Sequence, residues 1–301
     1  MGKLVNLGSL CVDQVYRVPA IAGSGESVAS IGHDTYPGGK GLNQSLAAAR
    51  AGASVSHVGC IGPDGEWLRD LLGTAGVNVE GVRCVSERSG HAVIQVDDQG
   101  RNAIVIVGGA NRAVQDLERE VAFQQVDAGD WLLIQNEIND LDLVLAQARK
   151  GNVALAFNVA PVDGREQGYD LAAVKLLIVN EIEAAAVAGV VAPQSALQRI
   201  CEKLPDADVV LTLGSQGLLY RGPSGAGGVP AFAVQAIDET GAGDAFIGFL
   251  MAGLLQEMTL PDALALGAAA GALAATQAGA ASSIPDLDSV RNLVASRAAG
   301  D

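Results

Sequence analysis

Short β-branched runs alternate with helical stretches along most of this chain, and the alternation limits the folds that are open to it. Parallel neighbours in a sheet are joined by long crossovers, so strand and helix in turn predict a mostly parallel sheet with helices on both faces, a three-layer α/β/α sandwich. The predicted strands are residues 4–7, 55–61, 131–135, 153–157, 176–179 and 209–213. The predicted helices are residues 41–51, 65–75, 140–150, 181–188, 195–204 and, in a purely helical tail, 241–256, 261–277 and 286–299.

Two glycine-broken stretches interrupt this pattern. Residues 12–35 are short and partly alternating, and residues 90–107 predict a hairpin whose tip is residues 97–100. Strands inserted into an α/β domain can pair into a small sheet that closes over the active site and excludes water. We predict such a lid from insertions at about residues 12–36 and 88–109, with ordinary edge strands as the alternative. Without linkers or repeats, residues 1–301 predict a single domain.

The formal net charge of −15 argues against nucleic acid or an anionic membrane as a partner. The chain starts without a basic region or a signal-type apolar core, and the alanine-rich run 263–275 is too short to span a bilayer. We therefore predict a cytoplasmic protein. The cysteines form no C-x-x-C pair and are predicted to be buried free thiols: Cys11, Cys60, Cys84 and Cys201.

Glycines at alternating positions open a long apolar helix in the segment 238–246. The backbone N–H groups of a helix start converge where the helix dipole is positive, and they suit the charge of a transferring phosphoryl group. Asp244 beside them can take a proton from an attacking hydroxyl. A tight turn in which Asp244 only supports the helix start fits the spacing equally well.

A second glycine-rich segment, 37–44, also precedes a helix. It is not a Walker A loop, because Gly41 follows Lys40 where Ser or Thr is required. Exposed backbone and the amide of Asn43 suit a polyhydroxyl ligand. A tight strand-to-helix turn explains the glycines but neither Lys40 nor Asn43.

Two further segments follow predicted strands. Asn180 and Glu183 lie on one face of a helical turn, where hard oxygen ligands can hold magnesium through its waters or simply cap the helix. The turn of residues 212–217 can wrap phosphates, although such turns are common. The chain has no G-x-G-x-x-G motif for dinucleotide binding and no G-x-S-x-G motif for a serine nucleophile. Its histidines form no zinc-type cluster: His33, His57 and His91.

These motifs in this order resemble the ribokinase (PfkB-type) carbohydrate kinase family, from Gly8 to Pro285. The resemblance implies a ribokinase-like fold with a β-sheet lid that often mediates dimerisation, and ATP, Mg²⁺ and a sugar as ligands. Asp244 matches the catalytic base, and the anion hole matches Gly241, Ala242 and Gly243. The sugar contacts match Asp13, Gly38, Gly39, Lys40, Asn43 and Glu137, together with Asp244.

The same resemblance implies the nucleotide and metal positions. The magnesium-associated pair matches Asn180 and Glu183. The ATP contacts match Asn180, Thr212, Gly214, Gly217 and Gly243, with adenine packing at Gly267 and Gly271. A monovalent-cation loop, which implies activation by K⁺, matches Asp238, Thr240, Ala274, Gln277, Gly279 and Ser283. Glu239 departs from the family pattern, which has a small residue there, and is expected to point to solvent or toward a cation.

The substrate is predicted to be a neutral sugar. A sugar phosphate would need a basic anchor, and the relevant segments offer only Lys40 and Arg101. Residues 100–104 and 108–111 resemble ribokinases, so D-ribose comes first. The alternatives are a nucleoside, fructose or 2-keto-3-deoxygluconate kinase, a weakly catalytic sugar-binding regulator on the same fold, and a nicotinamide dehydrogenase, for which the sequence supplies no fingerprint.

Overall fold

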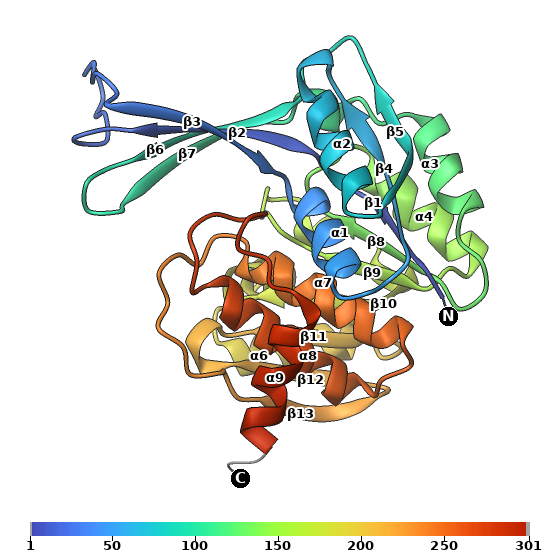
Figure 1. The fold of residues 1–301 in the computed structure, drawn as a ribbon. Helices are drawn as coiled ribbons and strands as arrows, with labels where there is room; N and C mark the ends of the chain where they lie inside the picture. The colour runs from blue at the N-terminus through green and yellow to red at the C-terminus, as the bar shows by residue number, and fades with distance from the viewer. Residues whose placement is uncertain (1, 299–301) are drawn as a thin grey trace.

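The computed structural model describes residues 2–298. Its centre is a nine-stranded sheet in the order β13-β12-β11-β10-β9-β8-β1-β4-β5 (Figure 1). All pairs from β11 to β5 are parallel, and β12 and β13 form an antiparallel hairpin at one edge. In sheet order the strands are β13 (Gly225–Val229), β12 (Leu218–Gly222), β11 (Asp208–Thr212), β10 (Val174–Asn180), β9 (Leu155–Asn158), β8 (Trp131–Gln135), β1 (Leu4–Leu7), β4 (Val55–Ile61) and β5 (Asn78–Cys84).

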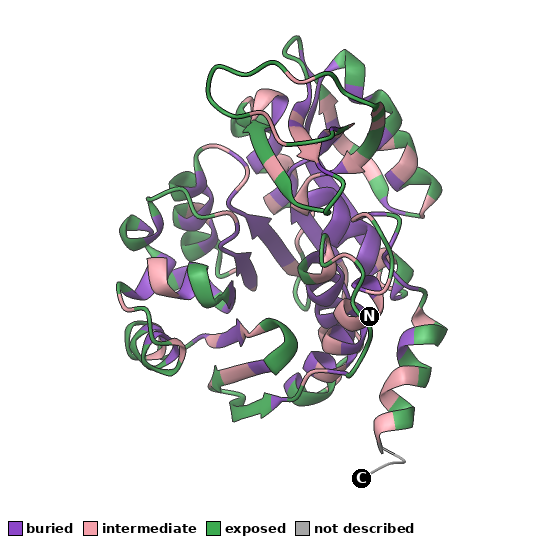
Figure 2. Cartoon of the chain, turned by 90° about the vertical axis from the view of Figure 1, so that its left-hand side faces the viewer, coloured by how far each residue is buried: buried purple, intermediate pink, exposed green. Residues whose placement is uncertain are grey.

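Helices cover both faces of this sheet and bury two separate apolar clusters. Strand residues alternate between the clusters, since Leu4 belongs to one and Val5 to the other. One face carries α1 (Lys40–Arg50), α2 (Glu66–Thr74), α7 (Ala242–Leu255), α8 (Leu260–Ala274) and α9 (Leu287–Ala298). The other carries α3 (Asp116–Gln124), α4 (Leu141–Gly151), α5 (Glu181–Ala188) and α6 (Pro193–Lys203). Short 3₁₀ turns are η1 (Pro63–Gly65), η2 (Gly109–Arg112), η3 (Glu166–Gly168), η4 (Leu171–Ala173) and η5 (Gly214–Gln216). Figure 2 shows the central strands buried between these layers.

The predicted α/β/α sandwich is confirmed, and every predicted strand and helix has a counterpart. Boundaries differ by a few residues: β9 begins at Leu155, not Val153, and α8 ends at Ala274, not Gln277. The last predicted helix extends to Ala299, which lies outside the described residues. The sequence pattern missed the helix α3 and the strands β5, β12 and β13. These strands lie at or near the edges of the sheet, contain glycine and are half-exposed, so they lack a clear apolar period.

The second sheet has four strands in the order β3-β2-β6-β7 and projects from the body (Figure 1). Its strands are β2 (Cys11–Arg17), β3 (Gly32–Gly38), β6 (Gly90–Val96) and β7 (Asn102–Val107). The predicted hairpin is confirmed as β6–β7, and the two insertions meet through the parallel pair β2–β6. At the inner end of this small sheet, Cys11 pairs with both Gly38 and Gly90, close to the start of α1.

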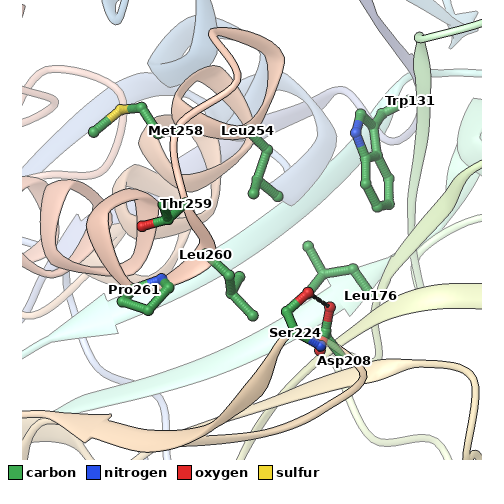
Figure 3. Close-up of a pocket in the computed structure, with 9 residues that line it drawn as sticks. All are labelled: Trp131, Leu176, Asp208, Ser224, Leu254, Met258, Thr259, Leu260 and Pro261. Carbon is green, nitrogen blue, oxygen red and sulfur yellow. Dashed lines mark hydrogen bonds between the residues drawn. The ribbon is translucent and has the colours of Figure 1, made fainter.

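A cavity of about 400 Å³ lies at the opposite end of the main sheet, where β8 and β11 begin with Trp131 and Asp208 (Figure 3). The carboxylate that lines this cavity, Asp208, already accepts hydrogen bonds from the backbone N–H and the hydroxyl of Ser224, at 3.0 and 2.6 Å. None of the sequence motifs lines it, so it is not the candidate site. No helix among residues 2–298 is long and apolar enough to cross a membrane.

The prediction of free thiols is confirmed for all of the cysteines. Their predicted burial is confirmed for Cys11 and Cys60, is only partial for Cys201 and is wrong for Cys84, which is exposed. Cys84 ends β5, an edge strand of the main sheet, and this position leaves its side chain uncovered.

Candidate active site

Polar residues from several elements meet at the carboxyl edge of the main sheet, as expected for parallel α/β folds. Asn180 and Thr212 are register partners at the ends of β10 and β11. Farther along the edge, the segment after β1 reaches the start of α1. The start of α7 lies between β10 and β1 along this edge. Its Asp244 is joined through Gln44 to Asn158, which ends β9.

Asp244 is the third residue of α7, and only 7% of its surface is exposed. Its Oδ2 accepts a hydrogen bond from Asn43 Nδ2 at 3.0 Å, and its Oδ1 accepts one from Gln44 Nε2 at 2.9 Å. Both donors belong to α1. A carboxylate that only caps its own helix would accept from the backbone of its own first turn. The arrangement therefore favours a functional carboxylate over a simple cap.

The start of α7 presents open backbone amides. Gly241 adopts a left-handed φ of 77°, and Ala242 N donates to Glu239 O at 3.2 Å. Within residues 2–298, the amides of Gly241, Gly243 and Asp244 have no hydrogen-bond partner. Gly243 is exposed, and a Cβ added to it would meet nothing within 4 Å. These amides beside a positive helix end form a place where an anion can bind. The predicted role of Ala242 stays a prediction, since its amide is engaged in the turn. Glu239 is exposed, as expected.

The start of α1 differs, because its amides are already satisfied. Glu137 accepts from Lys40 N at 2.9 Å and from the Ser9 hydroxyl, while Ser9 Oγ and O accept from Gly41 N and Leu42 N at 3.1 and 2.8 Å. Glu137, predicted as a sugar contact, thus also braces the turn that carries Lys40. The glycine-rich segment here positions side chains, and the first amides of α1 are not free.

Gly38 and Gly39 allow the close approach of two segments at this turn. A Cβ on Gly38 would lie 2.2 Å from an oxygen of Asp13. Gly39 has a φ of 92°, and its Cβ would lie 2.9 Å from Cys11 N. The turn therefore places the Asp13 carboxylate directly against the start of α1, in the group of predicted sugar contacts.

Charge is concentrated around this group. Burial, then the negative charges of Glu137 and Asp244, raise the pKa of Asp13 to about 6. Burial alone would lower the pKa of Lys40, but the carboxylates around it outweigh burial and raise this pKa: Asp244, Glu137 and Glu183. Lys40 therefore stays cationic in the field of the predicted base and of Glu183 from the predicted magnesium-associated pair.

Asn180 and Glu183 form a reciprocal helix cap. Asn180 Oδ1 accepts from Glu183 N, and the Glu183 oxygens accept from Asn180 N and Nδ2, each at 2.9 Å. The cap interpretation is confirmed. Both Glu183 oxygens are engaged, and residues 2–298 hold no cluster of three or more His, Cys, Asp or Glu side chains able to bind a metal. The donor set therefore fits a magnesium ion held through its own waters and substrate phosphates.

The predicted nucleotide residues lie on the β10–β11 side. Thr212 Oγ1 donates to Val179 O at 3.5 Å, and Gly217 N donates to Gly214 O at 3.0 Å in the turn after β11. Gly217 has a φ of 93°, and its Cβ would lie 2.2 Å from Val229 O. The turn requires this glycine whatever it binds.

Gly267 and Gly271 face α7 from α8. A Cβ on Gly267 would lie 2.7 Å from Phe246 O, and one on Gly271 would lie 2.9 Å from Ala242 O. Close helix packing explains both glycines, and their predicted place next to adenine stays a prediction.

The predicted cation loop is partly assembled. Asp238 Oδ2 accepts from Gly279 N at 2.8 Å, and its Oδ1 accepts from Thr240 N and Oγ1 at 2.9 and 2.6 Å. Burial opposes ionisation of Asp238, but these donors keep its pKa below the usual value. Ala274 O accepts from Gln277 N at 3.1 Å in the turn after α8. Ser283 is buried and donates to Ala280 O at 2.9 Å.

Sequence reasoning missed a buried polar group beneath Asp244. Its members are Asn6, Gln44, Gln135 and Asn158, all at most 5% exposed. Gln44 lay inside the second motif without an assigned role. Asn6 and Gln135 lay in predicted strands, and Asn158 lay just beyond one. A polar residue at the last inward position of an otherwise apolar strand is the signal that could have found them.

Comparison with known proteins gives a consistent result. The pfkB family of carbohydrate kinases matches residues 1–287. A ribokinase of Haemophilus influenzae is 34% identical over 94% of this chain and 95% of its own. The structure of Arabidopsis thaliana ribokinase complexed with ribose and ATP is 29% identical, with a TM-score of 0.85 over 98% of this chain and 99% of its own. That of Cryptococcus neoformans ribokinase in complex with ADP is 31% identical, with a TM-score of 0.84 over 97% and 99%. This chain belongs to the pfkB family of carbohydrate kinases.

Proposed function

We propose that this chain transfers the γ-phosphoryl group of ATP to a primary hydroxyl of a neutral sugar, in first place D-ribose, to give ribose 5-phosphate. The observation that carries the proposal is a buried carboxylate, Asp244, beside the open amides of Gly241 and Gly243. Support for ribose comes from relatives named ribokinase and from the neighbour complexed with ribose and ATP.

Each part of the site has a task in this reaction. Asp244 takes the proton of the attacking hydroxyl, and the amides at the start of α7 bind the charge of the phosphoryl group in transit. Lys40 adds a fixed positive charge beside them. Asp13 and Asn43 hold sugar hydroxyls, and the small sheet acts as a lid that excludes water.

Magnesium, when bound, neutralises phosphate charge. In our proposal Asn180 and Glu183 orient its waters, since their hydrogen bonds to each other hold both side chains in place at the start of α5. We also propose that K⁺ activates the enzyme through the loop at Asp238 and Gly279, where hydrogen bonds from the loop hold the Asp238 carboxylate and favour its ionised form.

A substrate panel tests the function. ADP release is measured with pentoses, hexoses, sugar phosphates and nucleosides, each with Mg²⁺ and with either K⁺ or Na⁺. We expect the highest kcat/KM on D-ribose and faster turnover in K⁺. Preference for a nucleoside or another sugar would correct the substrate, and ligand binding without ADP release on any member would favour the regulator.

Sugar affinity is expected to fall in acid. The pKa of Asp13 is about 6 in the free protein, and the ionised carboxylate accepts more hydrogen bonds from hydroxyls than the protonated form does. Protonation therefore competes with the sugar as the pH drops through about 6, and the dissociation constant of ribose should rise about tenfold between pH 7 and pH 5. Calorimetric titration without nucleotide measures this. Asp13→Asn should bind weakly with a flat pH profile, and an equally steep profile in that variant would contradict the assignment.

Gly38→Ala is expected to raise KM for the sugar about tenfold, the loss of one hydrogen bond to a charged group. The new methyl would overlap the Asp13 carboxylate at 2.2 Å, and that flexible side-chain end can move away at little cost to the fold. Steady-state kinetics and thermal unfolding measure the two effects. Gly168→Ala, where a Cβ meets nothing within 4 Å, is the matched control. An unchanged KM in Gly38→Ala would remove Asp13 from the sugar site.

We further propose a homodimer formed through the small sheet. The edge strand β7 exposes apolar residues on both of its faces, with Ile104, Val105 and Ile106 at 52%, 64% and 59% exposure. Sedimentation velocity should give a dimer for the natural chain and a monomer for Ile104→Glu/Ile106→Lys. A monomeric natural chain at micromolar concentration would contradict the dimer.

A further inference from the structure

Polar residues stand at or near the carboxyl ends of three adjacent parallel strands, β9, β8 and β1, and at the position of β4 that pairs with Asn6, on the face that α1 and α7 cover. In each strand the residue two positions earlier belongs to the apolar cluster of that face, so the polar side chain points into the same layer. The pairs are Leu4 and Asn6 in β1, Val55 and His57 in β4, Leu133 and Gln135 in β8, and Ala156 and Asn158 in β9. A polar layer thus follows the apolar one beneath α1, and Gln44 and Asn158 extend it to the start of α7.

Gln44 connects this polar layer to Asp244. Its Nε2 donates to Asp244 Oδ1 at 2.9 Å and to Asn158 Oδ1 at 3.1 Å, and its Oε1 accepts from Gln135 Nε2 at 2.7 Å. The Gln135 amide also donates to Asn6 Oδ1 at 3.0 Å. Gln44 is fully buried, so it cannot touch a substrate.

The orientation of the Gln44 amide is determined by its neighbours. Reversing it would place its oxygen against the Asp244 carboxylate and the Asn158 oxygen, and would leave two N–H groups facing each other at Gln135. Only the observed orientation satisfies all three contacts. The N–H end of Gln44 is therefore fixed toward the oxygen Oδ1 of Asp244, while Asn43 donates to the other oxygen.

We propose that Gln44 is a positioning residue for Asp244. It fixes the carboxylate in one rotamer and supports its ionised form through a donor that the polar layer holds rigidly. This inference rests on the proposed role of Asp244 as the base and adds a residue that acts on the reaction only through it.

The kinetic test uses Gln44→Glu, which has the same shape but replaces the N–H donor by a carboxylate or carboxylic acid. Two carboxylates at hydrogen-bond distance share a proton, so the acid limb of kcat should move up by at least about one pH unit, with partial recovery at higher pH. KM for ATP should be unchanged. Gln44→Met removes the donor without adding charge, and its kcat should fall about tenfold or more at every pH.

Ser45→Ala is the control. Ser45 is a buried neighbour on α1 whose hydroxyl bonds Asn6 and His57, at 2.8 Å each, and makes no hydrogen bond to the side chain of Gln44 or Asp244. It should lose stability while its kcat profile keeps the acid limb of the natural enzyme. An unmoved acid limb in folded Gln44→Glu, or a kcat within twofold of the natural value in Gln44→Met, would overturn the proposal.

A double-mutant cycle on the unfolding temperature tests the contact between Gln44 and Asp244 without an activity assay. Gln44→Glu should lower the unfolding temperature at neutral pH, and adding Asp244→Asn should restore most of it, because the swapped pair again joins an amide to a carboxylate. Additive losses in the double variant would overturn the proposal. A natural enzyme without kinase activity would count against the proposed function alone, since the cycle would still give its answer.

Discussion

Asp244→Asn is expected to lower kcat by about 10³- to 10⁴-fold while ribose still binds. The substitution keeps the shape of the side chain, and its oxygen can still accept a hydrogen bond from α1. The amide cannot take a proton, so the attacking hydroxyl loses its base. Single-turnover phosphoryl transfer measures the chemical step, and calorimetry measures sugar binding.

Asp262→Asn is a control for the helix-start interpretation. Asp262 is the third residue of α8, as Asp244 is of α7, but it is exposed and bonded to its own cap residue, Thr259. It should change stability by about 1 kcal/mol or less and leave kcat unchanged. Near-normal turnover in Asp244→Asn would remove Asp244 as the base and with it the proposed mechanism.

Gly241→Ala is expected to lower kcat by about 10²- to 10³-fold, as the loss of a preorganised anion hole does. Gly241 has a φ of 77°, which L-residues with a Cβ rarely adopt, and the new Cβ would lie 2.7 Å from the Cα of Ala280. That neighbour is backbone and cannot rotate away, so the turn must move and its amides must turn with it.

Gly164→Ala separates backbone strain from this displacement. Gly164 has a φ of 90°, but a Cβ there meets nothing within 4 Å. It should cost stability without affecting kcat. If Gly241→Ala lost stability only to the same degree and kept its turnover, the amides at the start of α7 would not be the anion site.

Much of the fold could be predicted because its strands are buried on both faces. Such strands appear in the sequence as continuous apolar runs. Their alternation with helices then predicts a parallel sheet with helices on both faces. The hairpin β6–β7 was predictable from its turn residues. Edge elements such as β12 and β13 were not, because their stability comes from a neighbouring strand and not from their own pattern.

The polar layer beneath Asp244 was hidden for a related reason. Asn6 and Gln135 stand in predicted strands. One polar residue within an apolar run does not indicate which other residue it will contact. Their hydrogen bonds cross the chain, and the bond between Asn43 and Asp244 spans 201 residues. No local pattern specifies a contact of that range.

The sequence by itself determined which residue types are available for the chemistry: two glycine-rich helix starts, one with Asp244 and the other with Lys40 and Asn43. It could not tell which start is open. Tertiary structure decided this, because Ser9 and Glu137 saturate the amides of α1, whereas those of Gly241 and Gly243 at α7 stay without a protein partner among residues 2–298. The physical reason is that a backbone N–H binds an incoming anion only where the fold has not already supplied an acceptor.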